Sequence, residues 1–259
     1  MSAVTEGDIS PWATAIHRLV QWVGNGRTLT ITGQLRVADG VELVKLLGTG
    51  DDLHGGAGQR RLSSSRNLPG VQSLLTGAVD AGLLRTQRGR LIPVKKYAQH
   101  AATAEGVRRL LVANAHHSAQ ASLAPEAEHP DLGRVRLAAL WTELSRNRQT
   151  SLVVSELAGM LWNTTTPGTS AIEQTQGSGE RADERIEFDE VVSWVLLDYA
   201  YLGLLAMNPD RTLVQLTPTG SREYDERPAL SGRFVRRCPF LAEVEARPLV
   251  EVPSVIASW

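Results

Sequence analysis

Basic residues gather in one segment of the chain, between Arg60 and Lys96. Asp80 is the single acidic residue there, so the segment carries a charge of about +7 although the whole chain carries −1. The basic residues are Arg60, Arg61, Arg66, Arg85, Arg88, Arg90, Lys95 and Lys96. A local basic patch attracts phosphate groups even where the protein has no net positive charge. The segment is therefore a candidate for binding nucleic acid.

Short polar side chains that can contact base edges lie within the same segment. The spacing predicts a helix that begins at Leu68-Pro69, with Gln72, Ser73 and Thr76 on its free side. Its apolar side consists of Val71, Leu74, Leu75, Ala78 and Val79. Basic residues before and after this helix would hold phosphates at both of its ends. The predicted nucleic-acid-binding residues are Arg60, Arg61, Arg66, Gln72, Ser73, Thr76, Arg88, Arg90, Lys95 and Lys96.

Two groups of residues have types that can bind a metal ion. Asp51, Asp52 and His54 lie in a glycine-rich stretch, where short Asp and His side chains are mostly turn formers. His116 and His117 are adjacent, so on a helix their rings would point apart and could not share one ligand set. We therefore expect no metal site.

No arrangement of residues indicates catalysis. The stretches Gly24-Asn25-Gly26 and Gly48-Thr49-Gly50 lack the following Gly or Gly-Lys of phosphate-binding loops. No Ser-His-acid or Cys-His set has local support. Cys238 is the only cysteine, which excludes an intramolecular disulfide and a cysteine-rich zinc site. We expect a protein that is not an enzyme and has no cofactor.

Length and composition favour two soluble domains. A chain of 259 residues with 42% apolar residues exceeds the usual size of one domain. The acidic start MSAVTEGDIS lacks the pattern of a secretory signal, and no apolar run reaches the roughly 20 residues that span a bilayer. We expect no membrane contact and a cytoplasmic, nucleoid-associated location.

The first half of the chain predicts helices followed by a hairpin. Ser10-Pro11 is a typical helix start, and Arg88-Gly89 is a candidate turn between two strands. A stretch rich in Gly, Ser and charge, 48–67, predicts a loop. The predicted elements are a helix over 11–23, a strand over 27–35, a helix over 37–47, a helix from 68, a hairpin over 83–94 and a helix over 98–118.

The second half repeats this order of elements. The predicted elements are a helix over 135–144, a helix capped by Ser155, a polar insertion over 163–185, a helix over 188–205 and a hairpin over 206–217. Gly82-Leu83-Leu84 and Gly203-Leu204-Leu205 stand at the same point of the two halves, which favours a duplicated module. The predicted domains are 1–118, a linker over 119–132, a second domain over 133–225 and a C-terminal extension over 226–259.

These patterns resemble the winged helix-turn-helix superfamily over about 37–97 and 135–221. Leu216-Thr217-Pro218-Thr219-Gly220 is similar to the Leu-Thr-Pro-x-Gly sequence that follows many wings of that superfamily. The stretches 47–51 and 89–95 also resemble uncharacterised actinobacterial winged-helix proteins. The resemblance implies a mainly α fold with short β-hairpins (α+β), arranged as tandem winged-helix domains. The chain departs from the pattern in one respect. Each unit has about 20 inserted residues between its second and third helices, where a DNA-binding winged helix usually has a tight turn.

The second unit has a different surface from the first. Six acidic residues over 181–198 would repel phosphate: Asp183, Glu184, Glu187, Asp189, Glu190 and Asp198. The long helix has a second apolar stripe formed by Trp194, Leu197 and Tyr201. Either the C-terminal extension or a homodimer interface would cover this stripe, and both can hold.

These features lead to one main expectation and two alternatives. We expect a transcriptional regulator that binds double-stranded DNA through its first domain and forms a homodimer through its second. The first alternative is a non-enzymatic protein-interaction scaffold of a chromosome- or plasmid-maintenance complex. The second alternative is a sensor that holds a small molecule between the domains.

Overall fold

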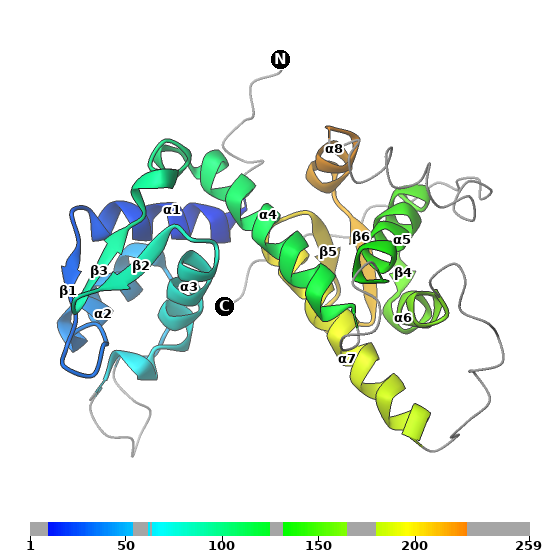
Figure 1. Cartoon of the computed structure of the whole chain (residues 1–259), viewed down its shortest axis with the longest axis horizontal. Helices are drawn as coiled ribbons and strands as arrows, with labels where there is room; N and C mark the ends of the chain where they lie inside the picture. The colour runs from blue at the N-terminus through cyan, green and yellow to red at the C-terminus, as the bar shows by residue number, and fades with distance from the viewer. Residues whose placement is uncertain (1–9, 54–61, 63, 125–131, 165–179, 227–259) are drawn as a thin grey trace. The chain divides into compact units, whose positions relative to one another are not determined.

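The structure, a computed structural model, describes residues 10–53, 62, 64–124, 132–164 and 180–226. These residues fall into two compact units that divide between Asn114 and Ala115. The described chain is mainly helical and contains two small antiparallel sheets of three strands each (Figure 1). The predicted class, mainly α with short hairpins (α+β), is confirmed. Within these ranges no helix is both long enough and apolar enough to cross a membrane.

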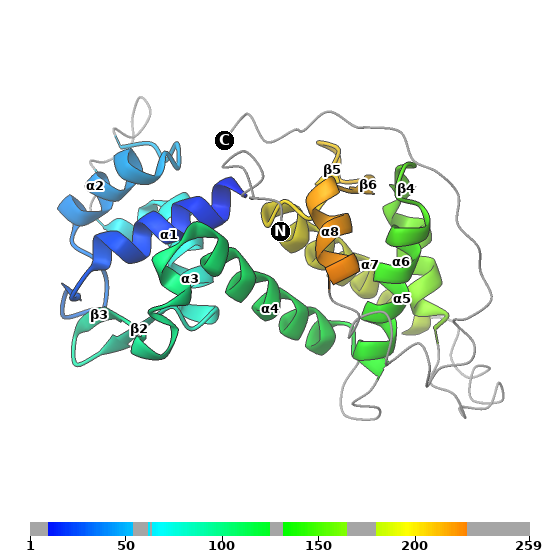
Figure 2. The ribbon, with the colours of Figure 1, turned by 90° about the horizontal axis from the view of Figure 1, so that it is seen from above.

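In the first unit, a three-helix core packs beside a sheet with the strand order β1-β3-β2. Helix α1 lies against α3 in both views (Figures 1 and 2). The elements of the core and sheet are α1 (Pro11–Val23), β1 (Arg27–Thr28), α2 (Val37–Leu47), the single turn η2 (Ser65–Asn67), α3 (Pro69–Asp80), β2 (Leu84–Gln87) and β3 (Arg90–Pro93).

Helix α1 begins and ends where its sequence predicts. The Ser10 hydroxyl accepts a hydrogen bond from the Ala13 amide at 3.4 Å, and Pro11 occupies the first helical position, where a missing N–H costs nothing. Gly24 ends the helix with a φ of 54°, a conformation that favours glycine. Its buried residues are Ala13, Ile16, Leu19, Val20 and Val23, all on one side.

The strand predicted over 27–35 is wrong for most of its length. Only Arg27 and Thr28 pair with β3, because the chain then turns back on itself. The Thr30 amide donates to the Gln34 carbonyl at 2.7 Å, and Gly33 takes a φ of 75°. The alternating threonines indicated a strand, but the left-handed glycine closes a turn instead.

The predicted hairpin and its turn are confirmed. Strands β2 and β3 pair from Leu84↔Pro93 to Gln87↔Arg90. Arg88 and Gly89, at the turn, have φ values of 49° and 68°. Two central residues with positive φ are typical of a turn whose twist matches that of the flanking strands.

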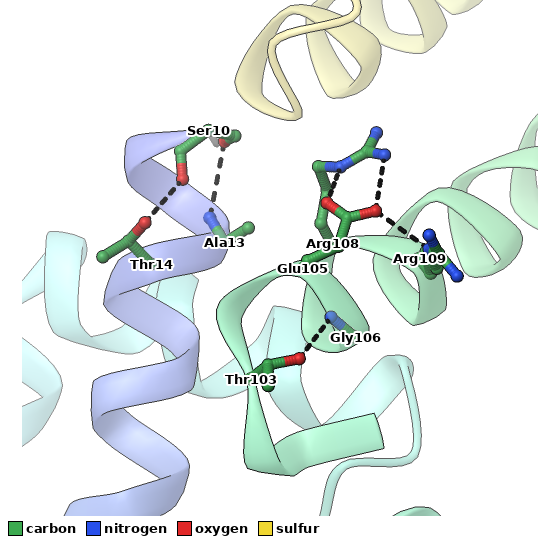
Figure 3. A network of polar contacts seen from close by, with 8 residues as sticks. All are labelled: Ser10, Ala13, Thr14, Thr103, Glu105, Gly106, Arg108 and Arg109. Carbon is green, nitrogen blue, oxygen red and sulfur yellow. Dashed lines mark hydrogen bonds and ion pairs between the residues drawn. The ribbon is translucent and has the colours of Figure 1, made fainter. Parts of the chain in front are cut away.

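Helix α4 (Ala104–Ser122) begins later than predicted. Residues 95–97 and 100–102 form single turns, η3 and η4, and Thr103 then accepts a hydrogen bond from the Gly106 amide at 3.1 Å (Figure 3). Glu105 binds Arg108 at 2.7 Å and Arg109 at 2.9 Å. Burial acts to raise the pKa of Glu105, but both arginines outweigh it and hold the pKa below its usual value. The helix extends to Ser122, into the segment 119–132 predicted as a linker.

The second unit repeats the order of elements found in the first. Its sheet has the strand order β4-β6-β5, the equivalent of β1-β3-β2. The elements are α5 (Leu132–Arg146), β4 (Leu152–Val153), α6 (Val154–Trp162), α7 (Glu180–Tyr201), β5 (Leu205–Met207), β6 (Leu213–Leu216) and α8 (Pro218–Glu226). Val153 rather than the predicted Ser155 precedes α6, and α7 both begins and ends before the predicted bounds of 188 and 205.

The sequence repeat corresponds to a repeated set of hydrogen bonds. The Leu83 carbonyl accepts from the Val94 amide at 2.9 Å, and the Leu204 carbonyl accepts from the Thr217 amide at 3.0 Å. Each bond joins the residue before the hairpin to the residue after it. The two hairpins are therefore closed in the same way.

A buried arginine of α5 forms hydrogen bonds to the ends of two other helices in the second unit. Arg136 donates to the carbonyls of Leu161 at 3.0 Å and Leu123 at 2.9 Å, and its remaining nitrogen reaches the carbonyl of Trp162 at 3.4 Å. Its guanidinium also lies 4.6 Å from the centre of the Phe188 ring. Burial lowers the pKa of Arg136 to about 10. These bonds satisfy carbonyls at the C-terminal ends of α4 and α6, which have no partners within their own helices.

Aromatic rings fill the centre of the same unit. His116 Nδ1 and the Tyr199 hydroxyl form a hydrogen bond of 2.7 Å. The Trp141 ring lies 5.0 Å from that of Tyr199 and is stacked with that of Tyr224. Burial raises the pKa of Tyr199 above its usual value. His116 is therefore a core residue of this unit, and His117 beside it is exposed.

Candidate nucleic-acid interface

Helix α3 has one buried side and one exposed side. Val71, Leu74 and Ala78 are buried in the core of the first unit. On the other side Ser73 and Thr76 are exposed, while Gln72 is half-buried. The side predicted to face nucleic acid is therefore open, although its exposed residues include no cation.

The N-terminus of α3 is occupied by an acidic side chain. The Asp51 carboxylate accepts hydrogen bonds from the amides of Gly70 at 2.8 Å and Val71 at 3.0 Å, and the Thr49 hydroxyl holds it at 2.8 Å. These amides are the groups that bind phosphate at the N-terminus of an anion-binding helix. Asp51 therefore stabilises the helix and repels phosphate from this end. Nowhere in the described ranges do three or more His, Cys, Asp or Glu side chains form a possible metal site, and His54 lies outside those ranges.

A hollow of about 400 Å³ lies beside α3, between this helix, the turn after β1 and the hairpin. We call it the α3 hollow. Its apolar lining residues are Leu29, Leu35, Leu75, Val79 and Leu91. Its remaining lining residues are Thr32, Gly33, Gln34, Arg66, Gln72, Thr76, Asp80 and Thr86.

Serines at the end of the long insertion hold three residues that line the α3 hollow: Gln34, Leu35 and Gln72. The Ser64 hydroxyl donates to the Gln34 side-chain oxygen at 2.7 Å, and the buried Ser65 hydroxyl donates to the Leu35 carbonyl at 2.9 Å. The Gln72 side chain then donates to the Ser65 carbonyl at 3.1 Å. These bonds fix η2 beside the first turns of α3 and place Arg66 at the edge of the hollow.

The hairpin carries exposed arginines on its outer face and at its tip. Arg85 and Thr86 point to opposite sides of β2, so Thr86 lines the α3 hollow and Arg85 does not. Arg88 lies at the tip. Arg90 donates to the carbonyls of Asn25 at 3.5 Å and Gly26 at 3.2 Å, which ties β3 to the connection between α1 and β1.

The structure brings together only part of the predicted binding set. Arg66, Gln72 and Thr76 line the α3 hollow. The members outside this lining are Ser73, Arg88, Arg90 and the exposed Lys95 and Lys96 of η3 (Lys95–Tyr97). Arg60 and Arg61 lie outside the described residues.

A scan against models of protein families found no match, and neither did searches of curated proteins and solved structures. The assignment of function to this surface therefore rests on the residues themselves.

Helix α7, the equivalent of α3 in the second unit, presents acidic residues. Glu184, Glu187 and Glu190 are exposed along it, and Arg185 is paired with Asp189 at 2.7 Å. Desolvation raises the pKa of Asp198 near the end of the helix. This surface would repel a phosphate backbone.

The predicted second apolar stripe of α7 is reduced to one exposed side chain. Trp194 is 61% exposed, but Leu197 is 9% exposed and Tyr201 is half-buried. Leu197 packs within the chain, and the role of the stripe in an interface between two copies stays a prediction. The guanidinium of Arg211 lies 5.8 Å from the centre of the Trp194 ring.

Three surface residues that matter were missed or misread from the sequence. Asp51 caps a helix that begins 18 positions later, which no local pattern indicates. Arg85 was counted in the basic segment but not among the binding residues, although the strand alternation puts it on the outer face of the hairpin. Ile31 was predicted to lie in a strand, and the turn over Thr30–Gly33 leaves it fully exposed.

Proposed function

We propose that this chain is a tandem winged-helix protein that binds double-stranded DNA through its first unit and is not an enzyme. The arrangement of elements supports this proposal. Each unit has the order helix, strand, helix, helix, hairpin, and in each sheet the first strand pairs with the last. This is the arrangement of the winged helix-turn-helix proteins that the sequence resembles.

The observation that carries the proposal is the difference in charge between the two units. The hairpin of the first unit presents Arg85, Arg88 and Arg90, while the long helix of the second presents Glu184, Glu187 and Glu190. Phosphate contacts supply most of the affinity of DNA-binding proteins. The first unit therefore carries the DNA contact, and the second serves assembly as a homodimer.

The contact we propose is led by the hairpin and not by the N-terminus of α3. Asp51 already satisfies the amides at that end, and no basic residue lies on α3. The arginines of the hairpin would hold phosphates, and Ser73, which is exposed on α3 outside the α3 hollow, would then face base edges. Such a protein would act as a transcriptional regulator at the nucleoid.

Fluorescence anisotropy with labelled fragments of mixed genomic DNA tests this proposal on the full chain. Arg88→Asn removes a charge at the tip and keeps a turn sequence, Asn-Gly, that favours positive φ. Arg18→Ala is the matched control, because Arg18 is exposed on α1, outside the hairpin. We expect the tip variant to bind more weakly and the control to bind like the unchanged protein. Absence of binding at low salt would refute the proposal, and equal affinity for every fragment would refute the specific regulator.

A scaffold for protein assembly is the second candidate. Val79 is 42% exposed in the α3 hollow, and Trp194 is 61% exposed on α7. Exposed apolar side chains such as these favour protein contacts over DNA contacts. Replacement of Trp194 by Asp should halve the mass measured by light scattering if this residue joins two copies. A mass that is the same for both proteins would exclude Trp194 from the interface.

A further inference from the structure

We propose that the α3 hollow is a docking site for an apolar segment of a partner protein, with an acidic residue at one end of the segment and a basic residue at the other. This inference goes beyond DNA binding and does not depend on it. The acidic end of the segment would lie at Arg66 and the basic end at Asp80.

The apolar part of the α3 hollow is accessible to a partner. Val79 is 42% exposed and Leu75 is half-buried, so the exposed side of α3 presents two aliphatic side chains next to each other in the hollow. Ile31, on the turn that borders the hollow, is fully exposed. Contact with an apolar segment would remove these side chains from water, whereas a sugar-phosphate backbone would not.

The charges of the α3 hollow lie at its two ends. Arg66 belongs to η2, which Gln72 holds beside the first turns of α3, and Asp80 is the last residue of α3. A helix of 12 residues is about 18 Å long. In the described ranges no ion pair involves the side chain of Arg66 or Asp80. A complementary segment therefore has its acidic residue at the end near Arg66 and its basic residue at the end near Asp80.

The same arrangement favours protein over DNA as the occupant of the α3 hollow. Asp51 lies at one end of α3 and Asp80 at the other, so a phosphate backbone along the helix would meet a carboxylate at each end. A peptide segment would instead place its basic residue beside the Asp80 carboxylate. The hydroxyls of Thr76 and Thr86 line the space between and can bind peptide carbonyl and amide groups.

Selection from a display library of random 12-residue peptides, with the full chain as bait, tests the proposal. We expect enriched peptides to share an apolar centre with an acidic residue on one side and a basic residue on the other. One enriched peptide is then synthesised, together with a version in which the acidic and basic residues exchange places. An exposed ion pair changes affinity by up to about fivefold, and the exchange removes two such pairs, so the exchanged peptide should bind up to about 25-fold more weakly.

Variants of the chain make the test specific to the α3 hollow. The double variant R66E/D80K should reverse the preference between the two peptides, a result that a damaged fold cannot give. Val79→Asp should abolish binding, whereas Leu46→Asp is a matched control at a side chain that is 40% exposed on α2 and does not line the hollow. Failure to enrich any peptide, or enrichment that persists in Val79→Asp, overturns the proposal. If Val79→Asp instead weakens DNA binding and no peptide is enriched, DNA is the occupant and the proposal is wrong.

Discussion

The carboxylate of Asp51 accepts a hydrogen bond of 2.8 Å from the amide of Gly70, across 19 positions of the sequence. This contact anchors one end of the long insertion to the helix that follows it. It also places a negative charge at the helix end where many DNA readers bind phosphate.

Replacement of Asp51 should have opposite effects on stability and on DNA binding. Asp51→Ala removes a helix cap and should lower the free energy of unfolding by about 1–2 kcal/mol, measured by urea denaturation. Asp51→Asn keeps an acceptor but removes the charge, so it should bind DNA more tightly than the unchanged chain at low salt. Glu42→Gln, with the same change of charge on the exposed side of α2, is the control. If Asp51→Asn and Glu42→Gln bind DNA with equal affinity, the Asp51 carboxylate does not repel the phosphates of DNA.

Replacement of Arg136 should destabilise the second unit. Arg136→Met leaves the carbonyls of Leu161 and Leu123 without their donor, so the free energy of unfolding should fall by about 3 kcal/mol. Glu184→Met, at an exposed position of α7 in the same unit, should change it by less than about 0.5 kcal/mol. Similar losses in the two variants, measured by chemical denaturation, would contradict a specific role for the buried arginine.

Asp198 should make the second unit less stable at neutral pH than at acidic pH. Desolvation raises its pKa, so the favourable contribution of the protonated carboxyl is fully present below the unfolded value of about 3.8 and is lost as pH rises through the folded value. Asp198→Asn should therefore raise the melting temperature at pH 7 and have little effect at low pH. The gain should stay below about 1 kcal/mol, because the residue is partly exposed to screening solvent. Glu190→Gln on the same helix is the control, and an equal gain at both pH values would contradict the assignment.

Two glycines should respond to alanine with opposite signs. A β-carbon at Gly220 would overlap the Leu204 carbonyl, so Gly220→Ala should lower stability by roughly 1–3 kcal/mol. At Gly159 the nearest atom is the end of the flexible Arg185 side chain at 3.3 Å, so Gly159→Ala should raise stability by up to about 1 kcal/mol. Thermal unfolding measures both effects. A loss of stability in both variants would contradict the predicted difference in sign.

Local signals in the sequence were sufficient to predict many elements. Ser10-Pro11 and Arg88-Gly89 determine a helix start and a turn through bonds and φ values within a few residues. The motif Thr217-Pro218-Thr219-Gly220 is held by one bond within itself and by one bond to Gly203, 14 positions earlier. The Thr217 hydroxyl donates to the Gly203 carbonyl at 2.7 Å and accepts from the Gly220 amide at 3.0 Å.

Features that depend on distant residues could not be predicted in this way. The role of Asp51 depends on a helix formed much later in the chain, and the burial of Leu197 depends on how α7 packs. The α3 hollow brings together residues from Leu29 to Leu91, which only the folded chain can do. For the same reason the positions of the basic residues in the sequence could not show that Arg66 lines this hollow while Arg88 does not.

The dependence of DNA binding on salt tests the central claim most directly. The logarithm of the association constant should fall linearly with the logarithm of salt concentration, and Arg88→Asn should reduce the slope by about one, the value for one lost phosphate contact. Arg18→Ala should leave the slope unchanged. If the full chain does not bind DNA at low salt, or if Arg88→Asn and the unchanged chain have the same slope, contact with DNA through the hairpin is contradicted.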